Sequence, residues 1–114
     1  MLKPKAHNLQ TYTDGHGTAW EVSDRKLYRC RQEVIHYADF FVGERRFWDA
    51  YVAGVEIAKA ILVPEQTAIR PGDVFVDEHD VQYEVKQVDR KDTRPVSLLV
   101  SLSASPIRYR STLS

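Results

Sequence analysis

Residues 81–86 alternate strictly between apolar and polar side chains, in the order Val-Gln-Tyr-Glu-Val-Lys. A period of two places alternate side chains on opposite faces of an extended chain, so this segment predicts a strand with one buried and one solvated face. Residues 74–77 precede it and residues 96–103 follow it, with a similar alternation. Residues 71–103 therefore predict a three-stranded antiparallel meander, around which the rest of the fold is arranged.

Charged connections separate these three strands. Residues 77–80, Asp-Glu-His-Asp, are too charged to be buried and predict a tight turn. Residues 89–95 carry five charged side chains and predict a loop. Val88 falls out of phase with Val85, which predicts a bulge or bend near Gln87.

Composition and pattern predict further strands upstream of the meander. Residues 9–13 and 18–22 predict two short strands, with a glycine-containing turn at residues 14–17 between them. Residues 26–37 are rich in aromatic and β-branched side chains, which favour a strand. Residues 55–63 alternate again and predict another strand.

Residues 44–53 are the one segment that predicts a helix. Its apolar side chains share one helical face and comprise Phe47, Trp48, Tyr51 and Val52. Glu44 suits the positive end of the helix dipole, and Gly54 suits the C-terminal stop. So short a helix depends on tertiary packing, and its aromatic face is expected to dock on the sheet.

These elements predict a single, mainly β domain over residues 1–114, with residues 1–6 and 106–114 as flexible or partner-ordered arms. Five to six short strands and one short helix favour a small antiparallel barrel or a two-layer sheet, because closure removes exposed edges. Phe75 is expected to point away from the core. The predicted core combines helix aromatics with inward-facing strand residues: Phe47, Trp48, Tyr51, Val74, Val76, Val81, Tyr83, Val85, Val96, Leu98 and Val100.

Charge and cysteine content restrict the function classes. Sixteen basic residues balance sixteen acidic ones, so no global field favours nucleic acid or an anionic membrane. Cys30 is the only cysteine, which excludes an intrachain disulfide and a multi-cysteine metal site. No apolar run approaches the length of a membrane span, and the first residues lack a signal-peptide pattern. A cytoplasm-like compartment is the expectation.

No pattern in the sequence predicts catalysis, a metal or a cofactor. The four histidines are widely spaced and lack metal-ligand spacing. Arg29 and Arg31 flank Cys30 and could lower the pKa of its thiol, although a core cysteine is the simpler interpretation. No phosphate-binding glycine loop or GxSxG motif is present. The acidic hairpin matches no EF-hand loop and is interpreted as solvated edge protection; its carboxylates are Asp73, Asp77, Glu78, Asp80 and Glu84.

Two basic groups remain as candidate contact surfaces. They comprise Arg25, Lys26, Arg29 and Arg31 on the long strand, and Arg90, Lys91 and Arg94 in the charged loop. Both groups could face phosphates or an acidic partner. The alternative interpretation is solubilising charge, because acidic residues are interspersed with them: Asp24, Glu33, Asp89 and Asp92.

The order of elements in residues 26–104 resembles the small phage head–tail joining proteins, the head-closure or "stopper" component of the neck in long-tailed phages and defective prophages. The resemblance lies in residues 41–51, the strand 55–63, and residues 74–76 followed by 81–88. The chain departs from that family in two places. Its hairpin turn is Asp-Glu-His-Asp where an Asp-Gly turn is usual, and the arginine-rich strand expected near Ile69-Arg70 is short.

The resemblance implies a small β-barrel that assembles as a homo-oligomeric ring between the portal-side adaptor and the tail, with the isolated chain possible as a monomer. Its implied partners are neck and tail proteins and the DNA in the channel, with no membrane and no small-molecule substrate. Its implied location is the virion neck, with the host cytoplasm during assembly. The expected contact residues are His79, Asp89, Arg90, Lys91, Asp92, Arg94, Arg25, Lys26, Arg29 and Arg31.

Two alternatives stay open at this point. One is a tail terminator or completion protein of the same particle, which sequence alone cannot separate from a stopper. The other is a free-standing SH3-like or OB-like module that binds peptide or nucleic acid. Such a module needs an exposed aromatic platform, for which Trp20, Tyr28 and Tyr37 are the candidates.

Overall fold

The computed structural model describes residues 9–40, 57–105 and 107–111. These residues form seven strands and no helix. The strands are β1 (Gly15–Ser23), β2 (Lys26–Phe40), β3 (Lys59–Pro64), β4 (Val74–Asp77), β5 (Gln82–Lys91), β6 (Ser97–Ala104) and β7 (Arg110–Ser111). The predicted helix at residues 44–53 lies outside the described residues, together with its core candidates Phe47, Trp48 and Tyr51.

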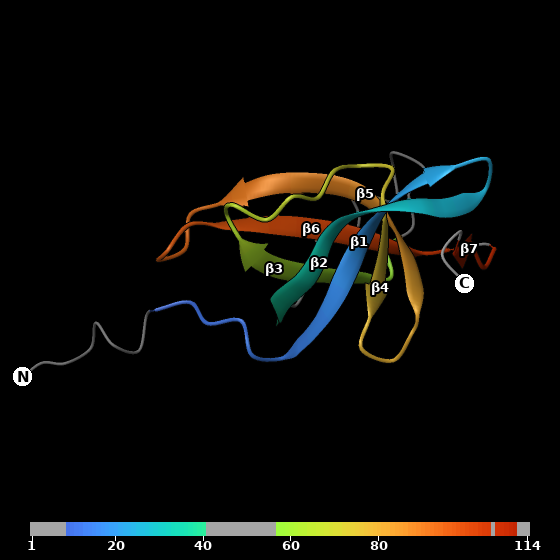
Figure 1. Cartoon of the computed structure of the whole chain (residues 1–114). Coiled ribbons are helices and arrows are strands. Elements are labelled where there is room, and N and C mark those ends of the chain that lie inside the picture. Colours follow the sequence, from blue (N-terminus) through green and yellow to red (C-terminus); the bar gives the residue numbers. More distant parts are fainter. Residues whose placement is uncertain (1–8, 41–56, 106, 112–114) are drawn as a thin grey trace, which may run out of the picture.

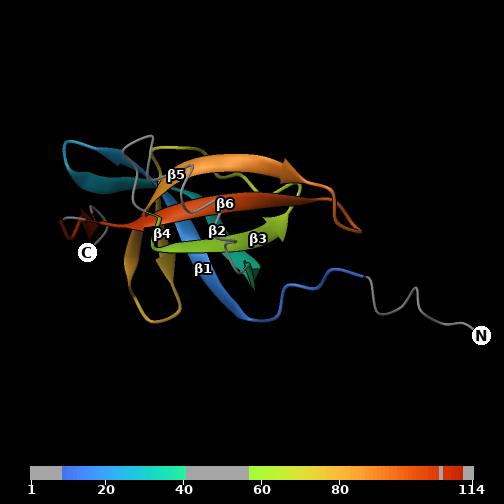
Figure 2. The ribbon, with the colours of Figure 1, turned by 180° about the vertical axis from the view of Figure 1, so that it is seen from behind.

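Six of the strands close into an antiparallel barrel, in the order β1-β4-β5-β6-β3-β2, with β2 pairing back onto β1 (Figures 1 and 2). The meander predicted from the alternation is present as β4, β5 and β6. β7 adds to β2 in parallel outside this ring. The predicted β class and barrel architecture are confirmed.

The β1–β2 hairpin contains the longest strand, and its turn lies at a different place from the predicted upstream turn, which is therefore wrong. Gly15 to Gly17 lie within β1 and pair with β2, so residues 14–17 do not form a hairpin turn. The chain reverses instead at Asp24 and Arg25, which both have positive φ angles, 52° and 62°. Within the predicted strand 9–13, only Leu9 forms an isolated bridge, to Arg94.

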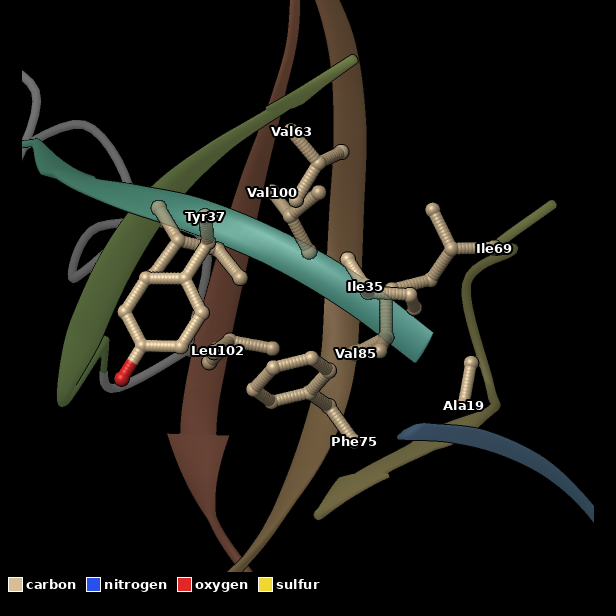
Figure 3. Packing of buried hydrophobic residues seen from close by; sticks show 10 residues of the cluster. Ala19, Ile35, Tyr37, Val63, Ile69, Phe75, Val85, Val100 and Leu102 are labelled. Carbon is tan, nitrogen blue, oxygen red and sulfur yellow. The ribbon is translucent and has the colours of Figure 1, made fainter. Parts of the chain in front are cut away.

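The barrel interior holds the main core, in which side chains from all six strands or their connections meet (Figure 3). Phe75 is completely buried there and packs edge-to-face on Tyr37, with ring centroids 5.8 Å apart. The expectation that Phe75 points away from the core is therefore wrong. The fully or nearly fully buried members are Ala19, Ile35, Tyr37, Ile61, Val63, Ile69, Phe75, Val85, Val100 and Leu102.

The remaining core predictions divide into three groups. Val74 is fully buried, as are Val85 and Val100. Four others are partly buried: Val76, Tyr83, Val96 and Leu98. Val81 is 43% exposed because it precedes β5 in the connection from β4, so its assignment to the core is wrong.

A smaller apolar cluster covers the outer face of the barrel at β3 and β6. Ala60, Leu62 and Leu99 are buried there, and Tyr12 packs on them from the N-terminal segment. The Tyr12 hydroxyl lies 2.7 Å from Ser97 Oγ. Both faces of β6 are therefore buried, so the serines that alternate in its sequence lie inside the protein and not on a solvated face.

The bulge predicted in the meander is confirmed. The register between β5 and β6 shifts between Val85 and Gln87, so Lys86 is the extra residue. A bulge bends its strand and increases the local twist, which helps a short sheet to close on itself. β5 can therefore contribute Val85 to the interior and still follow β6 as far as Lys91.

Candidate functional site

Most of the predicted contact residues lie at two distant ends of the barrel. The β1–β2 hairpin tip lies at one end, whereas the β4–β5 turn with His79 points in another direction, because Asp77 pairs with Gly17 near the start of β1 (Figures 1 and 2). Residues 107–111 contact both, through the pairing of Arg110 with Lys26 and the hydrogen bond from Arg108 to Asp80. We call residues 107–111 the C-terminal segment. The β5–β6 connection lies at the opposite end, where Gln10 N donates to Arg94 O at 2.6 Å.

Arg31 differs from the other basic residues of the hairpin in being largely buried in an ion pair, although its Nη1 also lies 3.8 Å from Glu21 Oε2, an oxygen that Arg29 contacts too. Arg31 Nε donates to Asp73 Oδ2 at 2.7 Å and Arg31 Nη2 donates to Asp73 Oδ1 at 3.1 Å, which is a bidentate pair. The hydrogen bond and charge of Asp73 raise the pKa of the Arg31 guanidinium against the opposing effect of burial. Arg31 therefore ties β2 to the start of β4, and Arg25, Lys26 and Arg29 remain as the exposed basic group.

Several charges of the β5–β6 end contact neighbouring side chains. Arg90 Nη1 lies 2.6 Å from Glu65 Oε2, and Lys91 Nζ lies 5.2 Å from the centre of the Phe40 ring. Gln87 Nε2 donates to Asp89 Oδ2 at 2.8 Å. Asp92 and Arg94 are exposed. This end therefore presents a charged surface whose side chains are partly held in place.

An open groove of about 890 Å³ lies at the other end, between the sheet and the C-terminal segment. Trp20 forms part of its wall, and the indole Nε1 donates to Thr18 Oγ1 at 2.9 Å. Of the three proposed platform aromatics, Trp20 lines this groove, Tyr28 is 45% exposed and Tyr37 is buried in the core. The groove is lined by Thr18, Trp20, Leu27, Val76, Asp80, Gln82, Arg108, Tyr109 and Arg110.

The C-terminal segment is ordered on its own barrel. Tyr109 N donates to Gln82 Oε1 at 2.7 Å, and Gln82 Nε2 donates to Tyr109 O at 2.9 Å. Arg108 Nη1 donates to the carbonyl oxygen of Asp80 at 3.0 Å, and Arg108 Nη2 contacts the Asp80 carboxylate. Sequence reasoning expected an arm that is flexible or ordered by a partner, because no local pattern indicates contacts this distant along the chain.

A polar cluster closes the barrel near the β4–β5 turn. The Tyr37 hydroxyl donates to Glu78 Oε1 at 2.9 Å, and Lys59 Nζ lies 3.4 Å from that hydroxyl and 3.7 Å from Asp39 Oδ1. Burial, followed by the Glu78 contact, raises the pKa of Tyr37 well above its usual range. The hydrogen bond from its own backbone N–H, aided by the Tyr37 hydroxyl and the His16 amide, lowers the pKa of Glu78 despite partial burial.

Replacing Tyr37 with phenylalanine is expected to lower the free energy of unfolding by about 1 kcal/mol at pH 7, through loss of this hydrogen bond. The lowered pKa of Glu78 gives stability that is present above about pH 4.5 and lost as the pH falls through the folded-state value. The raised pKa of Tyr37 gives stability that is present below about pH 10 and lost as the pH rises. The difference between wild type and Tyr37→Phe should therefore shrink in acid and in alkali, as urea unfolding across pH would measure.

Tyr83→Phe is the matched control, because it changes a second tyrosine whose ring lies near Lys59, 5.8 Å from Nζ to the ring centre. The hydroxyl that donates to Glu78 belongs to Tyr37, so the difference between wild type and Tyr83→Phe should be the same at pH 3 and pH 7. An equal difference for Tyr37→Phe at pH 3 and pH 7 would contradict the assigned coupling to Glu78.

The Cys30 thiol lies on β2, and two of the histidines lie on β1 and β2. Burial, followed by the charge of Glu33, raises the pKa of the Cys30 thiol, so the flanking arginines do not activate it. His16 and His36 face each other across β1 and β2 with ring centroids 6.2 Å apart. No group of three or more potential metal ligands is found among these residues.

No family model matches the chain, and no curated protein or solved structure matches it significantly. Within the described residues there is no helix with the length and apolar character of a membrane span.

Proposed function

We propose that the chain is a structural subunit of a phage neck, a head-closure or stopper protein that assembles as a ring, joins the portal-side adaptor to the tail and retains packaged DNA. The resemblance of residues 26–104 to head–tail joining proteins suggests this role. The geometry that supports it is the closed barrel with exposed, charge-bearing connections at two opposite ends. A subunit placed between two different assemblies needs two such surfaces on a rigid scaffold.

The two surfaces differ in a way that suits two different partners. At one end, the exposed basic side chains of Arg25, Lys26 and Arg29 lie on a hairpin that extends past the barrel. At the other end, the β5–β6 connection is fastened to the N-terminal segment through Leu9 and Gln10. Closure of the barrel removes most exposed strand edges, so each end can be used without promoting unspecific edge-to-edge aggregation.

Deletion of the coding sequence from the phage or prophage that carries it is expected to give heads that lose their DNA and do not join tails. Complementation with the wild-type chain should restore both steps, as electron microscopy and DNase protection would measure. Particles that hold DNA and join tails normally without the chain would exclude the role. Heads that keep their DNA but carry tails of aberrant length would instead identify a tail terminator.

The Trp20 groove favours a second candidate function, a free-standing module that binds an extended peptide or single-stranded nucleic acid. Aromatic side chains stack on bases, and Arg108 and Arg110 beside Trp20 suit an anionic strand. Titration of the purified chain into a fluorescently labelled oligonucleotide, followed by the anisotropy of the label, separates the two functions. Saturable binding that Trp20→Ala abolishes, together with normal particles after gene deletion, would favour the module.

A further inference from the structure

Several of the contacts that hold the C-terminal segment on the barrel are polar and exposed. The side chains of the Arg108–Asp80 ion pair are 62% and 73% exposed, and pairs of this kind contribute only about 0–1 kcal/mol. The β7 ladder joins only two residues to β2, in the parallel arrangement, and Ile107 remains 46% exposed. The partly buried hydrogen bonds between Gln82 and Tyr109 add to these contacts, but the two apolar core clusters include no residue of the segment.

Open space lies on both sides of the segment. The groove of about 890 Å³ lies along one side, and a second hollow of about 310 Å³, lined in part by Ser105 and Ile107, lies beside the connection to β6. Protein interiors are close-packed, and removing a side chain from them opens a cavity. The C-terminal segment is not packed in this way, so its departure leaves the barrel core unchanged.

The site holds the segment through its backbone and one arginine. The Gln82 amide both donates to and accepts from the backbone of one extended residue, as a neighbouring strand would. Asp80 accepts from an arginine that directly precedes that residue. The same segment of a second copy carries the same groups and is therefore a fitting occupant of this site.

The strand edge next to this site is occupied along much of its length. β2 pairs with β1 on one side, whereas on the other side it pairs with β7 at Lys26–Leu27 and with β3 at residues 38–40. Between these two ladders the β3–β4 connection contacts β2, because Ala68 N donates to Gln32 Oε1 at 3.2 Å and Arg31 binds Asp73. The docking position on this edge is therefore the short ladder at Lys26 and Leu27, where main-chain pairing holds an added strand.

We propose that the C-terminal segment exchanges between copies, so that residues 107–111 of one copy dock on Asp80, Gln82 and the β2 edge of its neighbour. The same contacts form within one chain or between two, and closely spaced copies favour the second arrangement by raising the local concentration of the segment. This exchange rests on the proposed ring for the place where copies meet, and it identifies a contact between neighbouring subunits.

Cysteine trapping tests the exchange. In a Cys30→Ser background, Lys26→Cys is placed on one chain and Arg110→Cys on a second chain that carries a larger tag. These two positions are ladder partners, and neighbouring strands are close enough for a disulfide. Both proteins are mixed at about 1 mM and oxidised slowly. The yield of mixed disulfide should exceed, by about tenfold or more, the yield in a control mixture in which Lys86→Cys takes the place of Lys26→Cys.

Lys86 is an exposed residue of β5 and reports random collisions. Adding Asp80→Ala and Gln82→Ala to the Lys26→Cys chain should reduce the mixed disulfide to the level of this control, because both anchors are removed. As a positive control, a single chain that carries both Lys26→Cys and Arg110→Cys should form the disulfide within itself. If this control closes but the yield of mixed disulfide between two chains is no higher than with Lys86→Cys, the exchange is overturned. A negative trapping result does not contradict the neck role. Normal particles after gene deletion would exclude the neck role but would not contradict a trapped exchange.

Discussion

Replacing Arg31 with alanine is expected to lower the free energy of unfolding by about 3–5 kcal/mol, the range for removing one partner of a buried ion pair. The Asp73 side chain is only 5% exposed and that of Arg31 is 19% exposed, so the ion pair is largely removed from water. Asp73 would keep its hydrogen bond from Arg70 N at 2.9 Å but would lose the bidentate guanidinium. Urea unfolding followed by far-UV circular dichroism measures the change.

Two further variants identify the cause of that loss. Arg29→Ala removes an exposed arginine from the same strand, whose Nε lies 3.7 Å from Glu21 Oε2, and should change stability by no more than about 0.5 kcal/mol. Asp73→Asn in the Arg31→Ala background should recover part of the lost stability, because a neutral amide costs less to bury than an unpaired carboxylate. A loss below about 1 kcal/mol for Arg31→Ala, or no recovery in the double variant, would contradict the proposed tie between β2 and β4.

The sequence predicted the meander because local alternation and bulge signals coincide there. Val85 is buried whereas the three residues before it are only partly buried, and the phase change at Val88 has its cause in the register shift before Gln87. Alternation does not indicate which side chains of β4 and β6 face the core, because both faces of these strands are largely buried. Phe75 and Val74 are both completely buried, so no choice of one inward face could place them correctly.

The hairpin turn and the candidate site depend on information that a linear pattern does not carry. A positive φ is uncommon for arginine, so the residue type at position 25 does not indicate a turn. The groove forms because the C-terminal segment meets Gln82, 27 residues away along the chain. The sequence proposes three aromatics as a binding platform, Trp20, Tyr28 and Tyr37, and of these Trp20 lines the groove.

Gly17→Ala is expected to lower the free energy of unfolding by about 1–3 kcal/mol, because the added methyl group overpacks a closed site. A Cβ at Gly17 would overlap the backbone carbonyl oxygen of Val76 and would lie 2.5 Å from Cζ of the buried Phe75 ring. The carbonyl belongs to β4, which pairs with β1 at this point, so it cannot move aside without weakening that ladder. The Phe75 ring is completely buried and packs edge-to-face on Tyr37, so its movement disturbs the core.

Gly72→Ala provides the contrast, since it tests a glycine that is required for its backbone conformation alone. A Cβ at Gly72 meets no atom within 4 Å, but its φ of +94° is strained for alanine, so the expected loss is about 1 kcal/mol. The two variants should also differ in the near-UV circular dichroism of the aromatic core, which Gly17→Ala perturbs through Phe75 and its neighbour Tyr37 and Gly72→Ala leaves unchanged. Equal stability for wild type and Gly17→Ala, with an unchanged aromatic spectrum, would mean that β1 and β4 are not held as closely as the barrel requires.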